Sequence, residues 1–258
     1  YGKLRGTALD EDAKRNLLEI YQLEKDWAKA ITIAEELPDV ATHKEIAEYY
    51  CELAAAEMMR ARPEAAADFL RQALERNRKC VRASLLLGDM ALQQERYEDA
   101  IACWQRIEQQ DPAFLALVAQ RMLDTFRKLQ RRDAGLLLLR GYLERYPSLD
   151  LLDVVFQLVL ESEGPESAYT MVRDELKRNP TLLGFDKLIE ARSHIAPPET
   201  RPDLDLAKSI VQGYTRRLAR YRCDNCGFKA RQFYWRCPAC GGWETYSPKR
   251  TEEFDLTP

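Results

Sequence analysis

An alanine recurs along this chain at an almost constant interval. The anchors stand 36, 34, 34 and 34 residues apart, at Ala30, Ala66, Ala100, Ala134 and Ala168. Apolar residues follow each anchor four and about seven positions later, which is the spacing of one helix face. A single hairpin of helices cannot bury its apolar faces alone, so a period of this length is typical of stacked hairpins. The repeat therefore predicts an all-α solenoid.

The composition agrees with helix. The chain has 11 Gly in 258 residues, 46% hydrophobic and 31% charged residues, and a net charge of −3. These values exclude collagen-like, disordered and disulfide-scaffold classes. The apolar run 136–139 is far shorter than the ~20 residues that cross a bilayer, so we expect no membrane span.

The clearest unit of the repeat covers residues 81–114. It carries Leu87-Gly88 in its first half, Ala100 and Trp104 in its second, and Asp111-Pro112 at its end. This pattern resembles the tetratricopeptide repeat (TPR), in which small residues let two antiparallel helices approach closely. Two later units depart from it, since Met122 and Phe156 stand at the position of Gly88.

The repeat and the motifs after it predict four regions. TPR-type units are expected near 11–46, 47–80, 81–114, 115–148 and 149–182, followed by the first helix of a sixth, so that the repeats cover 1–194. Residues 195–219 would form a proline-rich linker and a capping helix, which Asp203 would begin and which would run from Leu204 to about Leu218. A small metal module would follow at 220–246, and a tail at 247–258.

Two Cys-x2-Cys motifs stand close together near the C-terminal end, and their members are Cys223, Cys226, Cys237 and Cys240. Each spacer lets two thiolates face one ion, and Gly227 and Gly241 allow the turn that follows. Four thiolates make a closed tetrahedral site, which favours a structural role. We therefore expect one metal ion, zinc or iron, bound by the four cysteines in a rubredoxin-like or zinc-ribbon module. An iron site would leave an electron carrier as an alternative function.

Basic residues surround this motif. They are Arg216, Arg217, Arg220, Arg222, Lys229, Arg231 and Arg236. With the interleaved aromatic residues they make a nucleic-acid-binding ribbon an alternative. They would equally offset the negative charge of the thiolates, and the acidic chain as a whole makes nucleic acid the weaker interpretation.

The sequence does not predict an enzyme. It contains no glycine-rich phosphate loop and no His-Glu-x-x-His motif, and its two histidines, His43 and His194, stand far apart. Cys51, Cys80 and Cys103 are most simply small apolar packing residues. Seven cysteines, an odd number without a pairing pattern, indicate a reducing compartment, the cytosol.

A partner protein is expected on the concave face, which the first helix of each unit would line. The face would be apolar, and its residues would include Met58, Leu85, Asp89, Leu92, Leu123 and Phe126. An apolar concavity binds a partner or is covered internally. We expect the C-terminal module to fold back onto the repeats and to cover part of it.

TPR-like units followed by this particular motif are similar to the lipopolysaccharide assembly protein B family. The residues that carry the resemblance are Tyr221, Cys223, Cys226, Gly227, Phe228, Trp235, Cys237, Pro238, Cys240 and Trp243, together with the segment 45–53. The resemblance covers almost the whole chain. It implies that the four cysteines are the metal ligands of a rubredoxin-type domain.

The resemblance also implies a function. Members of that family promote degradation of LpxC, the deacetylase that commits precursor to lipid A, by the membrane protease FtsH. The implied partners are therefore FtsH, LpxC and other lipopolysaccharide-assembly proteins, and the implied location is the cytoplasmic side of the bacterial inner membrane. The family's N-terminal membrane anchor is absent from this chain, which begins at Tyr1 and which we take as a fragment.

Overall fold

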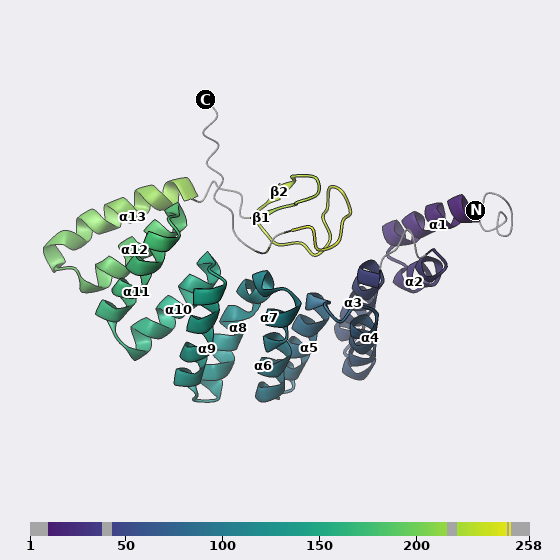
Figure 1. Cartoon of the computed structure of the whole chain (residues 1–258), viewed down its shortest axis with the longest axis horizontal. Helices are drawn as coiled ribbons and strands as arrows, with labels where there is room; N and C mark the ends of the chain where they lie inside the picture. Colours follow the sequence, from purple (N-terminus) through teal and green to yellow (C-terminus); the bar gives the residue numbers. More distant parts are fainter. Residues whose placement is uncertain (1–9, 38–42, 216–220, 247, 249–258) are drawn as a thin grey trace, which may run out of the picture. The chain divides into compact units, whose positions relative to one another are not determined.

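A computed structural model describes residues 10–37, 43–215, 221–246 and 248 (Figure 1). The chain divides into two compact units, residues 1–111 and 112–258. Both consist of consecutive antiparallel helices, and the second also contains the cysteine-rich module. The predicted all-α TPR-type architecture with a small C-terminal metal module is confirmed.

The first unit is built of helix pairs. Helix α1 packs on α2, α3 on α4, and α5 on α6, and a short helix α7 closes the unit. Their bounds are Asp10–Glu24 for α1, Trp27–Glu35 for α2, His43–Met59 for α3, Pro63–Arg76 for α4, Val81–Gln93 for α5, Tyr97–Gln105 for α6 and Ile107–Gln110 for α7.

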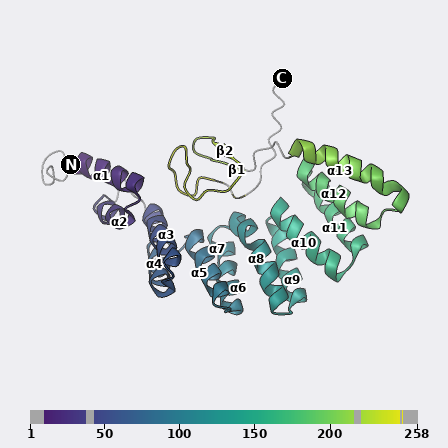
Figure 2. The same ribbon diagram turned by 180° about the vertical axis from the view of Figure 1, so that it is seen from behind.

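The second unit continues the pairing and ends in the module. Helix α8 packs on α9, α10 on α11, and α12 on α13, as both ribbon views show (Figures 1 and 2). The bounds are Pro112–Phe114 for the 3-10 turn η2, Leu115–Lys128 for α8, Arg132–Arg145 for α9, Leu149–Ser162 for α10, Pro165–Arg178 for α11, Leu182–Ile195 for α12, Pro198–Thr200 for the 3-10 turn η3, Arg201–Thr215 for α13, Tyr221–Arg222 for β1 and Lys229–Ala230 for β2.

The segment after α12 differs from the expected linker. Turn η3 leads directly into α13, which begins at Arg201, so Asp203 lies inside the first turn and is not the N-cap. The cause is Pro202. A proline lacks the backbone N–H, but the first turn of a helix does not need that donor, so the residue is accommodated there. The far end of the expected helix, at Leu218, lies outside the described residues.

The helix turns share one backbone feature. Lys25, Ala61, Glu95, Gln130 and Gly164 lie in the turns between the two helices of successive pairs, and each has a positive φ, between 56° and 91°. Four of the five are not glycine, although the left-handed conformation costs such residues about 1–2 kcal/mol. The packing of each helix pair therefore holds the turn in this conformation.

Small residues stand where paired helices approach most closely. Ala30, Ala66, Ala100 and Ala168 are fully buried. A Cβ atom added at Gly88 would lie 2.2 Å from Nε1 of Trp104, so the Trp104 ring packs directly on the backbone of α5. Trp104 therefore fills the interior of its own helix pair.

The fourth anchor is displaced by one residue. Ala134 is only half-buried, whereas the next residue, Gly135, is buried and a Cβ atom there would lie 2.9 Å from the ring of Phe126. Helix α8 has 14 residues where α5 has 13, and this extra residue moves the register of α9 along by one. Leu139, four residues after Gly135, is fully buried, whereas Leu138, four residues after Ala134, is only half-buried.

Helix α13 leaves apolar side chains exposed. Leu206, Ile210 and Tyr214 follow one another at intervals of four residues and are 60%, 53% and 67% exposed. On the same helix, Ala207 and Val211 are half-buried. Among the described residues, none of the helices has both the length and the apolar composition needed to cross a bilayer.

Candidate metal centre

The cysteine module is a small loop structure organised by short backbone pairings. Strands β1 and β2 are antiparallel, with Tyr221 opposite Ala230. Two isolated bridges add to them, one between Cys223 and Tyr246 and one between Arg236 and Trp243. A module of this size buries little apolar surface, so it needs another source of stability.

The two Cys-x2-Cys segments fold alike. In the first, the N–H of Gly227 donates to the carbonyl of Cys223 at 2.8 Å, and in the second the N–H of Gly241 donates to that of Cys237 at 2.9 Å. Gly227 and Gly241 have φ values of 74° and 72°, a region that side chains disfavour. The glycines therefore do what the sequence predicted, which is to turn the chain sharply after each pair of cysteines.

These turns bring the four sulfur atoms together. All four lie within 4.8 Å of one another, with 3.8 Å between the sulfurs of Cys223 and Cys240 and 3.7 Å between those of Cys226 and Cys237. Four thiolates bound at about 2.3 Å to one tetrahedral ion would stand about 3.8 Å apart. The cluster therefore fits one metal ion without rearrangement.

Hydrogen-bond donors around the cluster favour the thiolate form of two of the cysteines, Cys223 and Cys240. Burial opposes ionisation of Cys223, but donors from Thr245 and from the backbone of Cys226 and Asn225 lower its pKa to about 6. The N–H of Gly242 likewise lowers the pKa of Cys240. The N–H of Phe228 favours the thiolate of Cys226, but desolvation and the neighbouring thiols raise its pKa to about 12. Four adjacent thiolates without a cation repel one another, so binding of an ion must release protons.

The cluster is half open to solvent. Cys223 and Cys237 are buried, whereas Cys226 and Cys240 are exposed. The first cysteine of each pair therefore faces the core of the module and the second faces water. Tyr246 completes that core and is 1% exposed.

Aromatic side chains attach the module to the helices of the second unit. The ring of Phe114, in η2, stacks on Trp235 with centroids 5.5 Å apart and an interplanar angle of 7°, and it meets Phe233 edge-on at 6.0 Å. Phe114 is 5% exposed. The prediction that the module folds back onto the repeats is thus confirmed at this contact. The sequence pointed to the aromatic residues of the module but not to Phe114, whose only signal is an aromatic residue just after Asp111-Pro112.

The basic residues of the module that the structure describes differ in exposure. Arg222, Lys229 and Arg231 are exposed. Arg236 is half-buried, lies over the ring of Trp243 at 5.5 Å and donates from Nε to the carbonyl of Gly241 at 3.2 Å. It therefore contributes to the fold of the second cysteine turn. Arg216, Arg217 and Arg220 lie outside the described residues.

The residues expected to line a partner-binding face fall into two groups. Met58, Asp89 and Leu92 are half-buried and therefore accessible in part. The other three are buried, with exposures of 6%, 0% and 4% for Leu85, Leu123 and Phe126. This corrects the expectation for them. Phe126 packs on Gly135 of the neighbouring helix and so lies inside the helix pair.

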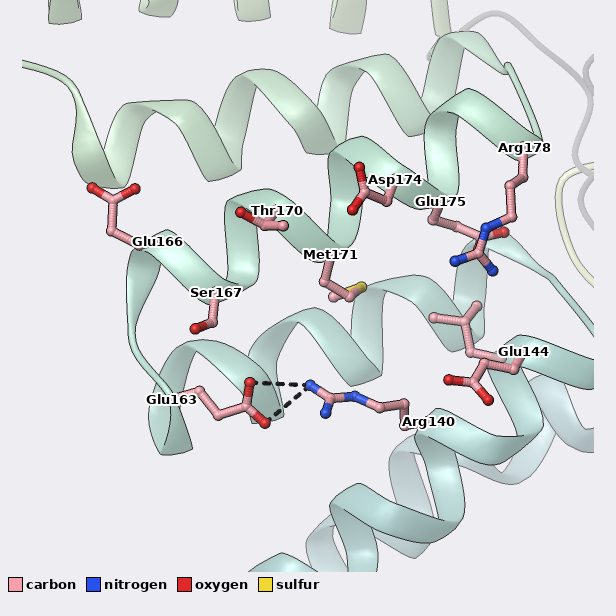
Figure 3. Close-up of a pocket in the computed structure, with 11 residues that line it drawn as sticks. Arg140, Glu144, Glu163, Glu166, Ser167, Thr170, Met171, Asp174, Glu175 and Arg178 are labelled. Carbon is pink, nitrogen blue, oxygen red and sulfur yellow. Dashed lines mark hydrogen bonds and ion pairs between the residues drawn. The ribbon is translucent and has the colours of Figure 1, made fainter.

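A cavity of about 540 Å³, lined by polar and apolar atoms alike, lies along α11, between it and the C-terminal parts of α9 and α10 (Figure 3). Its lining has more acidic than basic residues. Arg140 crosses part of it and is paired with Glu163 at 3.0 and 3.2 Å (Figure 3). The described residues that line it include neither histidine nor cysteine. The sequence did not single out this cavity.

Comparison with known families defines the class of protein. Residues 57–121 match the tetratricopeptide repeat model, and residues 221–248 match a model described as the rubredoxin metal binding domain. The chain therefore combines TPR-type repeats with a C-terminal segment similar to the rubredoxin metal binding domain.

Similarity to one protein extends over nearly the whole chain. Lipopolysaccharide assembly protein B of Escherichia coli K12 is 28% identical over 242 residues, which is 92% of this chain, and that of Haemophilus influenzae is 29% identical over 94% of it. The resemblance seen in the sequence is thus confirmed. The chain spans 62% of the length of both relatives. Among solved structures, pilF of Pseudomonas aeruginosa matches 80% of this chain and 91% of its own, with 14% identity and a TM-score of 0.46.

Proposed function

We propose that this chain is a protein-binding scaffold, not an enzyme, and that it acts in lipopolysaccharide assembly. The observation that carries the proposal is its similarity to lipopolysaccharide assembly protein B, which runs through the repeats and the metal module alike. Stacked helix pairs present extended surfaces, which suits the binding of other proteins.

The specific role that we propose is to promote degradation of the deacetylase LpxC by the membrane protease FtsH. A scaffold that binds both proteins raises the effective concentration of one at the other, and this needs no chemistry of its own. The proposed location is the cytoplasmic side of the inner membrane, through an anchor outside this sequence. Met58, Asp89 and Leu92 remain candidates for partner contact because each is accessible in part.

We propose a structural role for the ion, which is zinc or iron. Cys223, Cys226, Cys237 and Cys240 would hold it, and it would join the two cysteine turns and so maintain the surface that packs on Phe114. A closed set of four sulfurs leaves no position for a substrate. The ion supplies cross-linking of the chain and no catalytic step.

An electron carrier is the second candidate, because Cys226 and Cys240 are exposed and would bring an iron site close to a redox partner. Protein purified without added metal distinguishes the two. A colourless zinc-loaded chain removes the electron carrier, whereas a coloured, reversibly reducible iron site supports it.

The scaffold proposal is tested by the half-life of LpxC in E. coli cells. The cells are depleted of their own lipopolysaccharide assembly protein B and express this chain behind a membrane anchor. We expect LpxC to be degraded several times faster with the chain than without it. The Cys223→Ser/Cys226→Ser variant should lose this effect, and Cys103→Ser should retain it.

Two controls accompany this measurement. Immunoblots of membrane fractions confirm that each variant is present in equal amount, and an FtsH-deficient strain shows whether the degradation depends on that protease. An unchanged LpxC half-life in cells that contain the folded, membrane-bound chain would contradict the proposed role.

A further inference from the structure

A second pair of cysteines meets inside the first unit. Cys51 lies in the middle of α3, and Cys80 stands immediately before α5, 29 residues later. Their sulfur atoms are 3.7 Å apart, and the two residues are 0% and 1% exposed. The sequence assigned both to apolar packing, and the contact between them follows only from the packing of α3 against α5.

A buried carboxylate joins the two sulfurs. Glu48, one turn before Cys51 in α3, is 0% exposed, and its Oε1 lies 3.8 Å from the sulfur of Cys80. One oxygen of Glu48 and the two sulfurs all lie within 4.8 Å of one another. Packing of two small apolar side chains does not call for a buried carboxylate beside them.

An arginine orients this carboxylate from its other side. Arg82 donates to Oε2 of Glu48 at 3.1 Å and to Oε1 of Glu52 at 2.8 Å. One oxygen of Glu48 therefore faces the arginine, while the other faces the sulfurs. This is the arrangement in which an outer partner fixes the orientation of a metal-binding carboxylate.

The spacing of the pair matches that of the four-cysteine cluster. The sulfurs of Cys51 and Cys80 are as far apart as those of Cys226 and Cys237, at 3.7 Å in both cases. Two thiolates at about 2.3 Å from one tetrahedral ion require a separation of about 3.8 Å. Sulfur with carboxylate is a donor set that borderline and soft divalent cations prefer.

We propose that Glu48, Cys51 and Cys80 form a second metal site, which takes a thiophilic divalent cation of the zinc and cadmium class. Binding displaces the two thiol protons to solvent as two M–S bonds form. The cation brings two positive charges and two protons leave, so the buried charge does not change. The site therefore avoids the large cost of adding net charge to an interior.

A buried hydroxyl supports the site. Ser84 lies in the first turn of α5, four residues after Cys80, and is 0% exposed. Within the part of the chain that the structure describes, its Oγ has no hydrogen-bond partner. The backbone N–H of Ser84 donates to the carbonyl of Cys80 at 3.4 Å, which places Ser84 one helical turn from that cysteine. It is a polar atom that a bound cation or its water can satisfy.

Cadmium titration of the full chain tests the proposal. The protein is reduced, its seven free thiols are verified by intact mass, and cadmium chloride is added while ¹¹³Cd NMR counts the bound ions. We expect two equivalents per chain and two resonances, one from four sulfurs and one from a mixed sulfur and oxygen site. Neither result depends on the proposed function of the protein.

Matched variants assign each resonance. Cys51→Ser and Cys80→Ser should each remove the mixed resonance and leave one equivalent, Cys223→Ser should disrupt only the four-sulfur resonance, and Cys103→Ser should leave both. Glu48→Gln should weaken the second equivalent by about tenfold or more. Helical circular dichroism of each variant shows that it is folded.

Three results would overturn the proposal. The first is a single equivalent in the reduced wild-type chain. The second is a second equivalent that survives in both Cys51→Ser and Cys80→Ser. The third is a Cys51–Cys80 disulfide in the purified chain that, after reduction, yields a protein binding one cadmium ion, which would make the pair a redox couple instead.

Discussion

The helical repeats and the cysteine module reach a stable structure by different means. In the repeats, many buried side chains contribute, and each helix pair depends on a close approach such as that of Trp104 to Gly88. In the module, four sulfur atoms and a few aromatic rings supply most of the cross-links and the core. A change in one repeat should therefore have a graded effect, whereas the loss of one sulfur should abolish the module.

The largest effect is expected when cysteines of the four-sulfur cluster are replaced, which separates the module from the repeats most clearly. Structural zinc sites contribute apparent binding free energies of about 10–16 kcal/mol, far more than a module of this size gains from burial. We expect Cys223→Ser/Cys237→Ser to lose one metal ion and to expose the module to protease, while the helical circular dichroism remains within a few per cent. Metal analysis and limited proteolysis measure the outcome. A general loss of helix would show that the repeats depend on the module.

The next largest effect is expected inside a repeat. Gly88→Ala places a methyl group 2.2 Å from the Trp104 ring and should lower the free energy of unfolding by about 1–3 kcal/mol. The matched control is Gly141→Ala in α9, where the nearest atom is 3.7 Å away at the end of Arg145. It should raise stability by about 0.5–1 kcal/mol, because alanine favours helix over glycine. Urea unfolding measures both, and equal effects would contradict the close approach.

A smaller effect is expected where the two regions meet. A double-mutant cycle of Phe114→Ala and Trp235→Ala should give a coupling energy of about 0.5–1.5 kcal/mol, the value of a stacked aromatic pair beyond its burial. Phe114→Ala combined with Phe228→Ala serves as the control, since Phe228 is 43% exposed. Coupling near zero for the first pair would mean that the module and the helices are independent.

The smallest effect concerns the turns between paired helices. Glu95 has a φ of 59°, a conformation that glycine adopts without strain, so Glu95→Gly should raise stability by about 0.5–1 kcal/mol. Its neighbour Gln94 has a φ of −89°, and Gln94→Gly should bring no gain. Thermal unfolding of the two variants side by side measures the difference. A loss of stability in Glu95→Gly would show that the turn does not strain the backbone.

Much of the fold could be predicted because it depends on the spacing of residues that lie close together in the sequence. The 34-residue period predicted paired helices, and the two Cys-x2-Cys motifs with their glycines predicted a cluster of four sulfurs. The register within a pair could not be predicted as well. Ala134 matched the period, yet Gly135 makes the close contact, because the length of the preceding helix depends on how it packs.

The limits of prediction were greatest for side chains that meet across helices. Leu123 and Phe126 have the spacing of an open face and are nevertheless buried. The sequence does not predict the positive φ of Lys25, Ala61, Glu95 and Gln130, because glycine is the residue type that usually indicates that conformation. These features depend on how the two helices of each pair pack against each other.

The spacing of residues along the chain was thus enough to predict the helix repeat, the cluster of four cysteines and the resemblance to lipopolysaccharide assembly protein B. Tertiary packing alone brought Phe114 onto Trp235 and placed Cys51, Cys80 and Glu48 together. The physical reason is that ligands three residues apart are held by one turn of the backbone. Residues 29 or more apart come together only when whole helices pack, and their contact depends on every side chain between those helices.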